Sequence, residues 1–78
     1  MARLVLFGPA RDAAGTSTSE FAGLSVEEVL QEAVARFGSS FADVLSISQI
    51  WINGEPLRGP VAVGPYDEIA VLPPVSGG

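Results

Sequence analysis

Seventy-eight residues with a net charge of −5 predict one small acidic domain. The chain has no cysteine, histidine or lysine, which excludes a thiol nucleophile, an imidazole base, a Schiff-base amine and a nitrogen- or sulfur-ligated metal site. The acidic balance opposes nucleic acid or an anionic membrane as a partner and favours a basic protein surface. No apolar run approaches the ~20 residues of a membrane span, and the apolar start is too short for a signal peptide. We therefore expect a cytoplasmic protein.

The first predicted strand covers residues 4–7, where alternate side chains face opposite sides of a sheet. The two pairs are Leu4 with Leu6 and Val5 with Phe7. Good helix formers between Pro9 and Gly15 predict a short turn of helix. The polar residues 16–21 are expected to form an exposed second strand.

The clearest predicted element is an amphipathic helix that begins after Ser25 and ends at Gly38. Ser25 and Glu28 fit a capping box, in which each residue satisfies a free backbone N–H near the other. Six apolar residues then recur at helical spacing and form one stripe: Val26, Val29, Leu30, Ala33, Val34 and Phe37. A second short helical turn is expected around residues 41–45.

A β-branched and aromatic run over residues 47–52 predicts the next strand. Asn53-Gly54 follows it and is a strong hairpin signal between apolar runs. We expect the return strand near Leu57 or around residues 61–63. Trp51 is expected in the core or half-buried at an edge.

The last strand is predicted over residues 68–72, after a turn at residues 64–67. Ile69 and Val71 share one face of this strand. Pro73-Pro74 ends it, because proline has no N–H to continue a ladder.

The predicted order of elements is β-β-α-β-β-β. One helix with one apolar stripe covers one face of a sheet, which indicates an α+β domain of two layers. The first and last strands are the most apolar, so we expect them to lie centrally and to pair with each other. This is a β-grasp, or ubiquitin-like, fold: a mixed sheet of four to five strands packed on one main helix. We assign residues 1–74 to this domain and residues 75–78 to a flexible tail.

The tail ends in two residues without side chains, Gly77 and Gly78. Such an end can pass through a narrow channel and bring an unhindered carboxylate to the active site of another protein. Adenylation by ATP would turn that carboxylate into a mixed anhydride that sulfur or nitrogen can attack. Pro73-Pro74 favours an extended exit from the domain. The alternative is an ordinary frayed terminus.

Three segments resemble the MoaD family, the small subunits of molybdopterin synthase among the MoaD/ThiS ubiquitin-like sulfur carriers. Residues 6–15 are similar to the family's LFFAxxRExxG signature, and residues 67–78 are similar to its DEVAxxPPVSGG ending. Ile52-Asn53-Gly54-Glu55 matches the family's central Val-Asn-Gly-Glu. The resemblance covers the whole chain.

The resemblance implies a sulfur carrier that is not catalytic alone and binds no cofactor. A MoeB-like adenylating enzyme would use ATP to activate Gly78, and a sulfurtransferase would supply the sulfur of a thiocarboxylate. A MoaE-like large subunit would then receive the tail and pass the sulfur to cyclic pyranopterin monophosphate, in molybdenum cofactor biosynthesis. Gly77 would give access, and the residues from Pro73 through Val75 to Ser76 would set direction and reach.

Phe7 and Leu72 should point away from the helix, near the root of the tail. Together with Pro73 and Pro74 they are candidates for a patch on this chain at which these partners dock. The alternative is ordinary apolar surface. The resemblance also suggests Arg11 at the interface, against the alternative of a solvated side chain.

The acidic side chains Glu27, Glu28 and Glu32 are interpreted as a solvated helix face. Without a basic partner or a metal, nothing in the sequence tunes their acidity, which disfavours a catalytic pair.

Two other function classes remain open. A ubiquitin-like modifier would be joined through Gly78 to lysines of other proteins, and the absence of lysine here would forbid lysine-linked chains of this protein. A sulfur carrier for another pathway would serve thiamine or cysteine synthesis. The sequence does not name the acceptor.

Overall fold

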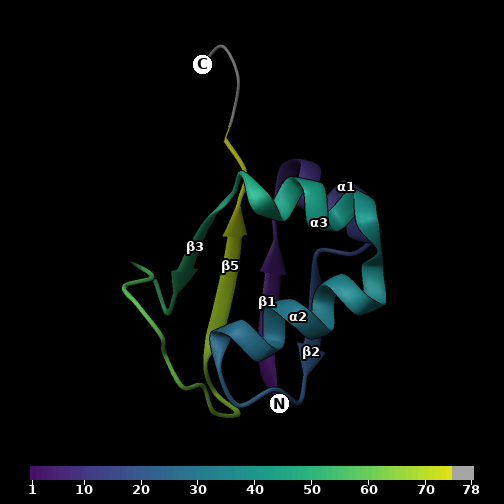
Figure 1. Ribbon diagram of the computed structural model, residues 1–78. Coiled ribbons are helices and arrows are strands. Elements are labelled where there is room, and N and C mark those ends of the chain that lie inside the picture. The colour runs from purple at the N-terminus through teal and green to yellow at the C-terminus, as the bar shows by residue number, and fades with distance from the viewer. Residues whose placement is uncertain (75–78) are drawn as a thin grey trace.

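The structure is a computed structural model that describes residues 1–74. In this part of the chain, one five-stranded mixed sheet packs against helices (Figure 1). The strands are ordered β2-β1-β5-β3-β4, with these bounds: β1 Ala2–Leu6, β2 Thr18–Phe21, β3 Gln49–Ile52, β4 Glu55–Pro56 and β5 Glu68–Leu72. The helices are α1 Gly8–Ala14, α2 Val26–Phe37 and α3 Ser39–Ser46. The predicted α+β, β-grasp fold is confirmed, and the proposed tail over residues 75–78 lies outside the described residues.

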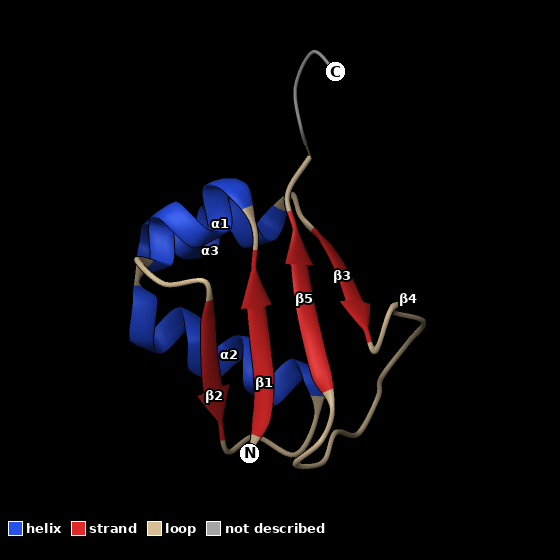
Figure 2. Ribbon diagram, turned by 180° about the vertical axis from the view of Figure 1, so that it is seen from behind, coloured by secondary structure: helices blue, strands red, loops and turns tan. Residues whose placement is uncertain are grey.

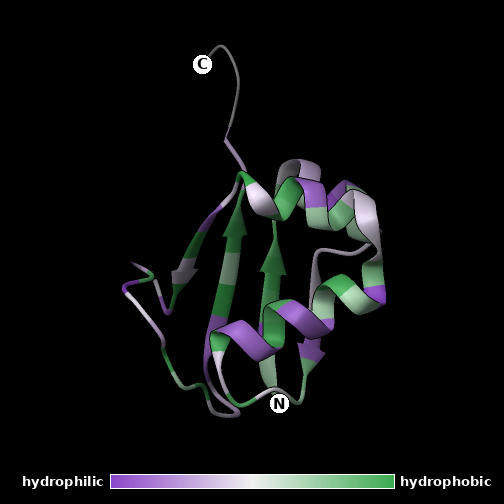
Figure 3. Ribbon diagram, viewed as in Figure 1, coloured by the Kyte–Doolittle hydropathy of each residue, from purple (hydrophilic) through white to green (hydrophobic). Residues whose placement is uncertain are grey.

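The first and last strands lie centrally and pair with each other, as predicted, and the structure shows that the pairing is parallel. Leu4 is the register partner of Ile69, and Leu6 is the partner of Val71. All four side chains are buried beneath the helices, and Figure 3 shows both strands as largely hydrophobic. Helix α2 crosses this face of the sheet, while α1 and α3 contact each other near the end to which β1 and β5 point (Figure 1).

The first strand differs from its prediction at both ends. It begins at Ala2, whose side chain is buried, and it ends at Leu6. Phe7 is the residue that precedes α1, and its carbonyl accepts the N–H groups of Ala10 and Arg11 at 3.1 and 3.4 Å. Phe7 leaves the ladder because Pro9, near the helix start, favours helical backbone directly after it.

The predicted side-chain cap of α2 is confirmed, and further side-chain hydrogen bonds hold the residues that precede the helix. Ser25 Oγ accepts the N–H of Glu28 at 3.1 Å. The Glu28 carboxylate accepts the N–H of Leu24 at 2.8 Å, one residue before the predicted partner, and Glu32 accepts the N–H of Gly23 at 2.7 Å. Two of the three acidic residues are therefore not merely solvated, because they hold the segment that enters the helix.

The apolar stripe of α2 is buried only along its centre. Val26, Val29 and Ala33 are buried, whereas the other three stripe residues are half-buried: Leu30, Val34 and Phe37. The predicted second helical turn is a helix of eight residues, α3. Its Phe41 is fully buried and packs edge-on against Phe37, with ring centroids 5.2 Å apart.

The outer strands are shorter than predicted. β2 begins at Thr18, and its last residue, Phe21, is buried rather than exposed. β3 begins at Gln49, because Ile47 belongs to the end of α3 and is 65% exposed. Trp51 is half-buried in β3.

The Asn53-Gly54 hairpin is confirmed, since φ is 49° at Asn53 and 84° at Gly54. Both values are those of the mirror-image turn that suits twisted strands. The return strand is only Glu55–Pro56, although the N–H of Leu57 still donates to the Ile50 carbonyl at 2.9 Å.

The expected alternative return strand at residues 61–63 is wrong. This segment lies beside the start of α2 instead, where the Val61 carbonyl accepts the N–H of Val26 at 2.9 Å. The N–H of Val63 donates to the Leu24 carbonyl at 3.0 Å. The backbone N–H and C=O groups of this segment therefore bond to residues at the start of α2 and not to a strand of the sheet.

Truncation of the buried ring should cost far more than removal of the cap. We expect Phe41→Ala to lower the free energy of unfolding by ~3–5 kcal/mol and Ser25→Ala by ~0.5–2 kcal/mol. Leu30→Ala should lie near ~2 kcal/mol, because its side chain is only half-buried. Urea denaturation of the three variants measures these values, and a cap loss larger than the Phe41 loss would contradict the assigned core.

Candidate functional site

Figure 2 shows the face of the sheet that the helices leave uncovered. Half-buried apolar residues from three strands lie on this face. Val5 of β1 is the register partner of Ala70 in β5, and Ala70 is the partner of Trp51 in β3. Because partners across a ladder share a face, these side chains form one row on the side opposite to Leu4 and Ile69. They are half-buried only.

Phe7 and Leu72 lie at one end of this row. Leu6 and Val71 are register partners, so the chain leaves β1 at Phe7 and β5 at Leu72 on the same end of the sheet. Phe7 is 47% exposed and Leu72 is half-buried. We call the five residues the open-face patch: Val5, Phe7, Trp51, Ala70 and Leu72.

The other predicted interface residues lie at the same end. Pro73 is half-buried and Pro74 is exposed, directly after β5. Arg11 is exposed on α1, which begins where β1 ends. The structure thus brings the predicted interface residues to one end of the sheet, and their role in docking stays a prediction. Four predicted site residues lie outside the described part of the chain: Val75, Ser76, Gly77 and Gly78.

The opposite end of β5 is anchored by a hydrogen-bonded turn. The Asp67 carboxylate accepts the N–H of Gly64 at 2.7 Å and the side-chain amide of Asn53 at 2.9 Å. The Asn53 carbonyl oxygen accepts the N–H of Glu68 at 2.9 Å. These bonds lower the pKa of the Asp67 carboxyl below its ordinary value of about 3.8. The bond from Gly64 has the larger effect and the bond from Asn53 the smaller one. They join the hairpin to the start of β5, the strand that ends at Leu72.

The described residues contain little that could act as a reactive centre. Residues 1–74 bring no three histidine, cysteine, aspartate or glutamate side chains together in a way that could hold a metal ion. The carboxylates of Glu28 and Glu32 are committed to backbone N–H groups. Within the same range, no helix has both the length and the apolar character needed to cross a bilayer.

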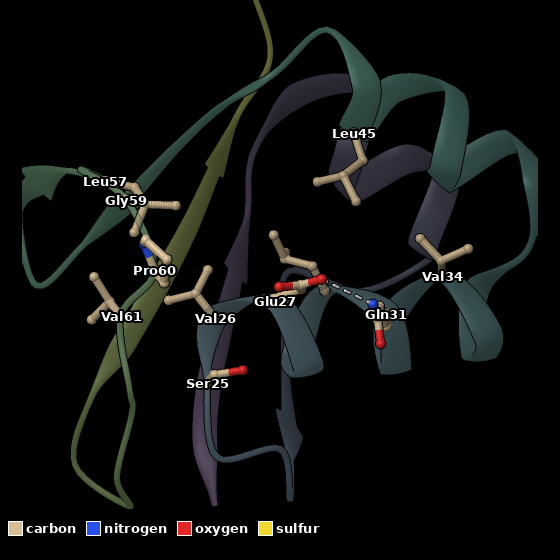
Figure 4. Close-up of a pocket in the computed structure, with 11 residues that line it drawn as sticks. Ser25, Val26, Glu27, Gln31, Val34, Leu45, Leu57, Gly59, Pro60 and Val61 are labelled. Atoms are coloured by element: carbon tan, nitrogen blue, oxygen red, sulfur yellow. Dashed lines mark hydrogen bonds between the residues drawn. The ribbon is translucent and has the colours of Figure 1, made fainter.

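A second surface feature lies on the helix side. An apolar groove of about 680 Å³ runs between α2, the end of α3 and the segment after β4 (Figure 4). Leu30, Leu45 and Leu57 lie on its three walls, and the Gln31 amide donates to the Glu27 carboxylate at 3.4 Å along the rim. Sequence reasoning missed this groove, because it depends on how residues 57–61 pack and no local pattern signals that.

The sequence profile of the ThiS family matches residues 4–78. The small archaeal modifier protein 1 of Methanosarcina acetivorans is 29% identical, with a TM-score of 0.79 over 99% of this chain and 95% of that one. A chain of the BexX/CysO complex of Amycolatopsis orientalis is 21% identical, with a TM-score of 0.82 over the whole of both chains. A chain in the complex of subunits 1 and 2 of molybdopterin-converting factor from Helicobacter pylori is 20% identical, with a TM-score of 0.72 over 99% and 97% of the two chains. No curated protein matches the chain by sequence.

The Asp67 anchor predicts a specific loss of stability in acid. A carboxyl whose pKa is lower in the folded state stabilises the fold fully above its unfolded pKa and loses that contribution as the pH falls through the folded value. Between about pH 6 and 2 we expect the stability of the wild type to fall more steeply than that of Asp67→Asn, which lacks this titration. Urea midpoints across this range measure the difference, and parallel curves would contradict the anchor.

Proposed function

The chain belongs to the ThiS family of ubiquitin-like sulfur carriers and modifiers, and we propose that it is a sulfur carrier that serves as the small subunit of molybdopterin synthase. The observation that carries the proposal is the family match, which extends through the diglycine to Gly78. The choice of molybdopterin rests on the ending Pro73-Pro74-Val75-Ser76-Gly77-Gly78 and its resemblance to MoaD. The chain also shares its fold with a chain in the complex of the two molybdopterin-converting factor subunits of Helicobacter pylori.

The proposed reaction begins at the carboxyl group of Gly78. A MoeB-like enzyme joins this carboxylate to the AMP part of ATP and releases pyrophosphate. Sulfur supplied through the sulfurtransferase, at the oxidation level of sulfide, then attacks the carbonyl carbon of the adenylate, displaces AMP and leaves a thiocarboxylate. In the large subunit the sulfur passes to cyclic pyranopterin monophosphate, and water restores the carboxylate.

This chain contributes presentation rather than catalysis. It has no cysteine, histidine or lysine, so the nucleophiles and the acid–base groups belong to the partners. Gly77 leaves the carbonyl of Gly78 unhindered, and Pro73 and Pro74 direct the chain away from β5. The partners are a MoaE-like large subunit, the adenylating enzyme and the sulfurtransferase.

The open-face patch suits the docking of such a partner. It lies beside Pro73, so a protein seated on it stands next to the start of the tail. Towards the other end of the same face, Arg3 of β1 is the register partner of Glu20 and of Glu68. An apolar centre with a charged rim is the usual anatomy of a protein interface. A net charge of −5 favours a partner with a basic rim.

A protein modifier is the second candidate function. The observation in its favour is the likeness to the Methanosarcina acetivorans modifier protein, which at 29% identity exceeds the 20% of the molybdopterin-converting factor chain. A modifier would end in an isopeptide bond between Gly78 and a lysine of another protein, whereas a carrier returns to the free carboxylate. A carrier for thiamine or cysteine synthesis would differ only in its acceptor.

Intact-mass spectrometry separates carrier from modifier. We incubate the protein with ATP, the activating enzyme and a sulfur donor, and we expect the mass gain of one oxygen-to-sulfur exchange, which disappears when the large subunit and the pterin precursor are added. The control that lacks Gly78 should keep its melting temperature, because the core lies within residues 1–74, and should form no molybdopterin. Stable conjugates to acceptor lysines without a thiocarboxylate would instead establish the modifier, and activity without Gly78 would refute both.

Substitutions in the open-face patch should weaken partner binding without unfolding the domain. We expect Phe7→Asp and Leu72→Asp to reduce affinity for the large subunit at least ~10-fold, since loss of an interface hot spot costs ~2 kcal/mol or more. Their melting temperatures should change little. Leu6→Asp is the matched contrast and should unfold the domain, because its side chain is 1% exposed. Calorimetric titration and thermal melts measure both effects, and a reversed pattern would mean that the two faces are assigned backwards.

A further inference from the structure

The two edges of the sheet are the places where another strand could be added. β2 and β4 are the edges of the sheet. An edge strand presents unpaired N–H and C=O groups, and these form a template for an extended peptide or for a second copy of the same chain. The β4 edge is closed by its sequence, because it is two residues long and one of them is Pro56, which has no N–H to donate.

The register shows which groups of β2 face outward. The N–H of Leu6 donates to the Ser17 carbonyl at 2.8 Å, directly before the paired residues Val5 and Thr18. In an antiparallel ladder, hydrogen-bonded and non-bonded pairs alternate. The backbone groups of Thr18 and Glu20 therefore point away from β1 and would be the ones that receive a new strand.

Both outward carbonyls already have donors within this chain. The Thr16 hydroxyl donates to the Thr18 carbonyl at 2.9 Å. The guanidinium of Arg36, from α2, donates to the Glu20 carbonyl at 3.4 Å and to Ser19 Oγ at 2.8 Å.

The same guanidinium lies 4.2 Å from the centroid of the Phe21 ring, and this contact holds it at the edge. Arg36 thus bonds to the edge strand and stacks on the last residue of that strand. An incoming strand would have to displace it from both positions.

We infer that Thr16 and Arg36 are specificity-determining residues that close the β2 edge to strand addition. With β4 closed by its length and by Pro56, partners do not bind by adding a strand to the sheet, and copies of the chain do not pair edge to edge. This holds for a carrier and for a modifier alike, so its test is independent of the proposed function.

The test is self-association of the full chain in sedimentation velocity over a concentration series. The variant Thr16→Val with Arg36→Gln frees both carbonyls. The control, Thr16→Ser with Arg58→Gln, keeps the hydroxyl and has the same net charge. We expect the edge variant to associate at least ~10-fold more tightly than the wild type, because each new pair of strands gains several hydrogen bonds, and the control to match the wild type. Amide exchange at Thr18 and Glu20 should slow as the concentration rises.

Adding Thr18→Pro to the edge variant should restore the monomer, because it removes an outward N–H without touching the bonds to β1. A folded edge variant that stays monomeric with unchanged amide exchange overturns the inference, as does association that survives Thr18→Pro. If the edge variant does not fold, Thr16→Val alone decides: measurable association supports the inference and its absence overturns it.

Discussion

The parallel pairing of β1 with β5 joins the beginning of the chain to its last strand, and the rest of the domain is arranged around it. Parallel strands cannot be joined by a tight turn, so the whole segment between them serves as the crossover. This segment supplies the helices that cover one face and the outer strands that complete the sheet. The pairing also brings the ends of both strands, at Phe7 and Leu72, to one side of the molecule.

Side chains alternate along these two strands, so the residues that form the core lie on one face of the sheet and the residues of the open-face patch lie on the other. Leu4, Leu6, Ile69 and Val71 are fully buried under the helices and hold the layers together. The residues between them, such as Val5 and Ala70, face the open side and remain half-buried. A change on the open side therefore alters a surface at little cost to the core. The Asp67 anchor sits directly before β5, at the opposite end of that strand from Leu72.

Features that local chemistry decides were predictable from the sequence. The bounds of β5, the Ser25 cap and the Asn53-Gly54 turn all follow from residues close together in the chain. The exit of Phe7 from the strand and the position of residues 61–63 were not, because each depends on competition between segments. Arg36 shows why contacts between distant residues were not predictable. Its side chain bonds to Ser19 and Glu20, which lie 17 and 16 positions before it in the chain. The tail residues of the candidate site were predicted from a motif alone and lie outside the described residues, and the groove beside α2 was missed entirely.

The proposed activation of Gly78 as an acyl group would give the composition of the chain a physical reason. An acyl adenylate reacts with any nearby amine or thiolate, and a long side chain close to the tail would compete with the intended sulfur donor. A chain without lysine or cysteine offers no such side chain anywhere on its surface.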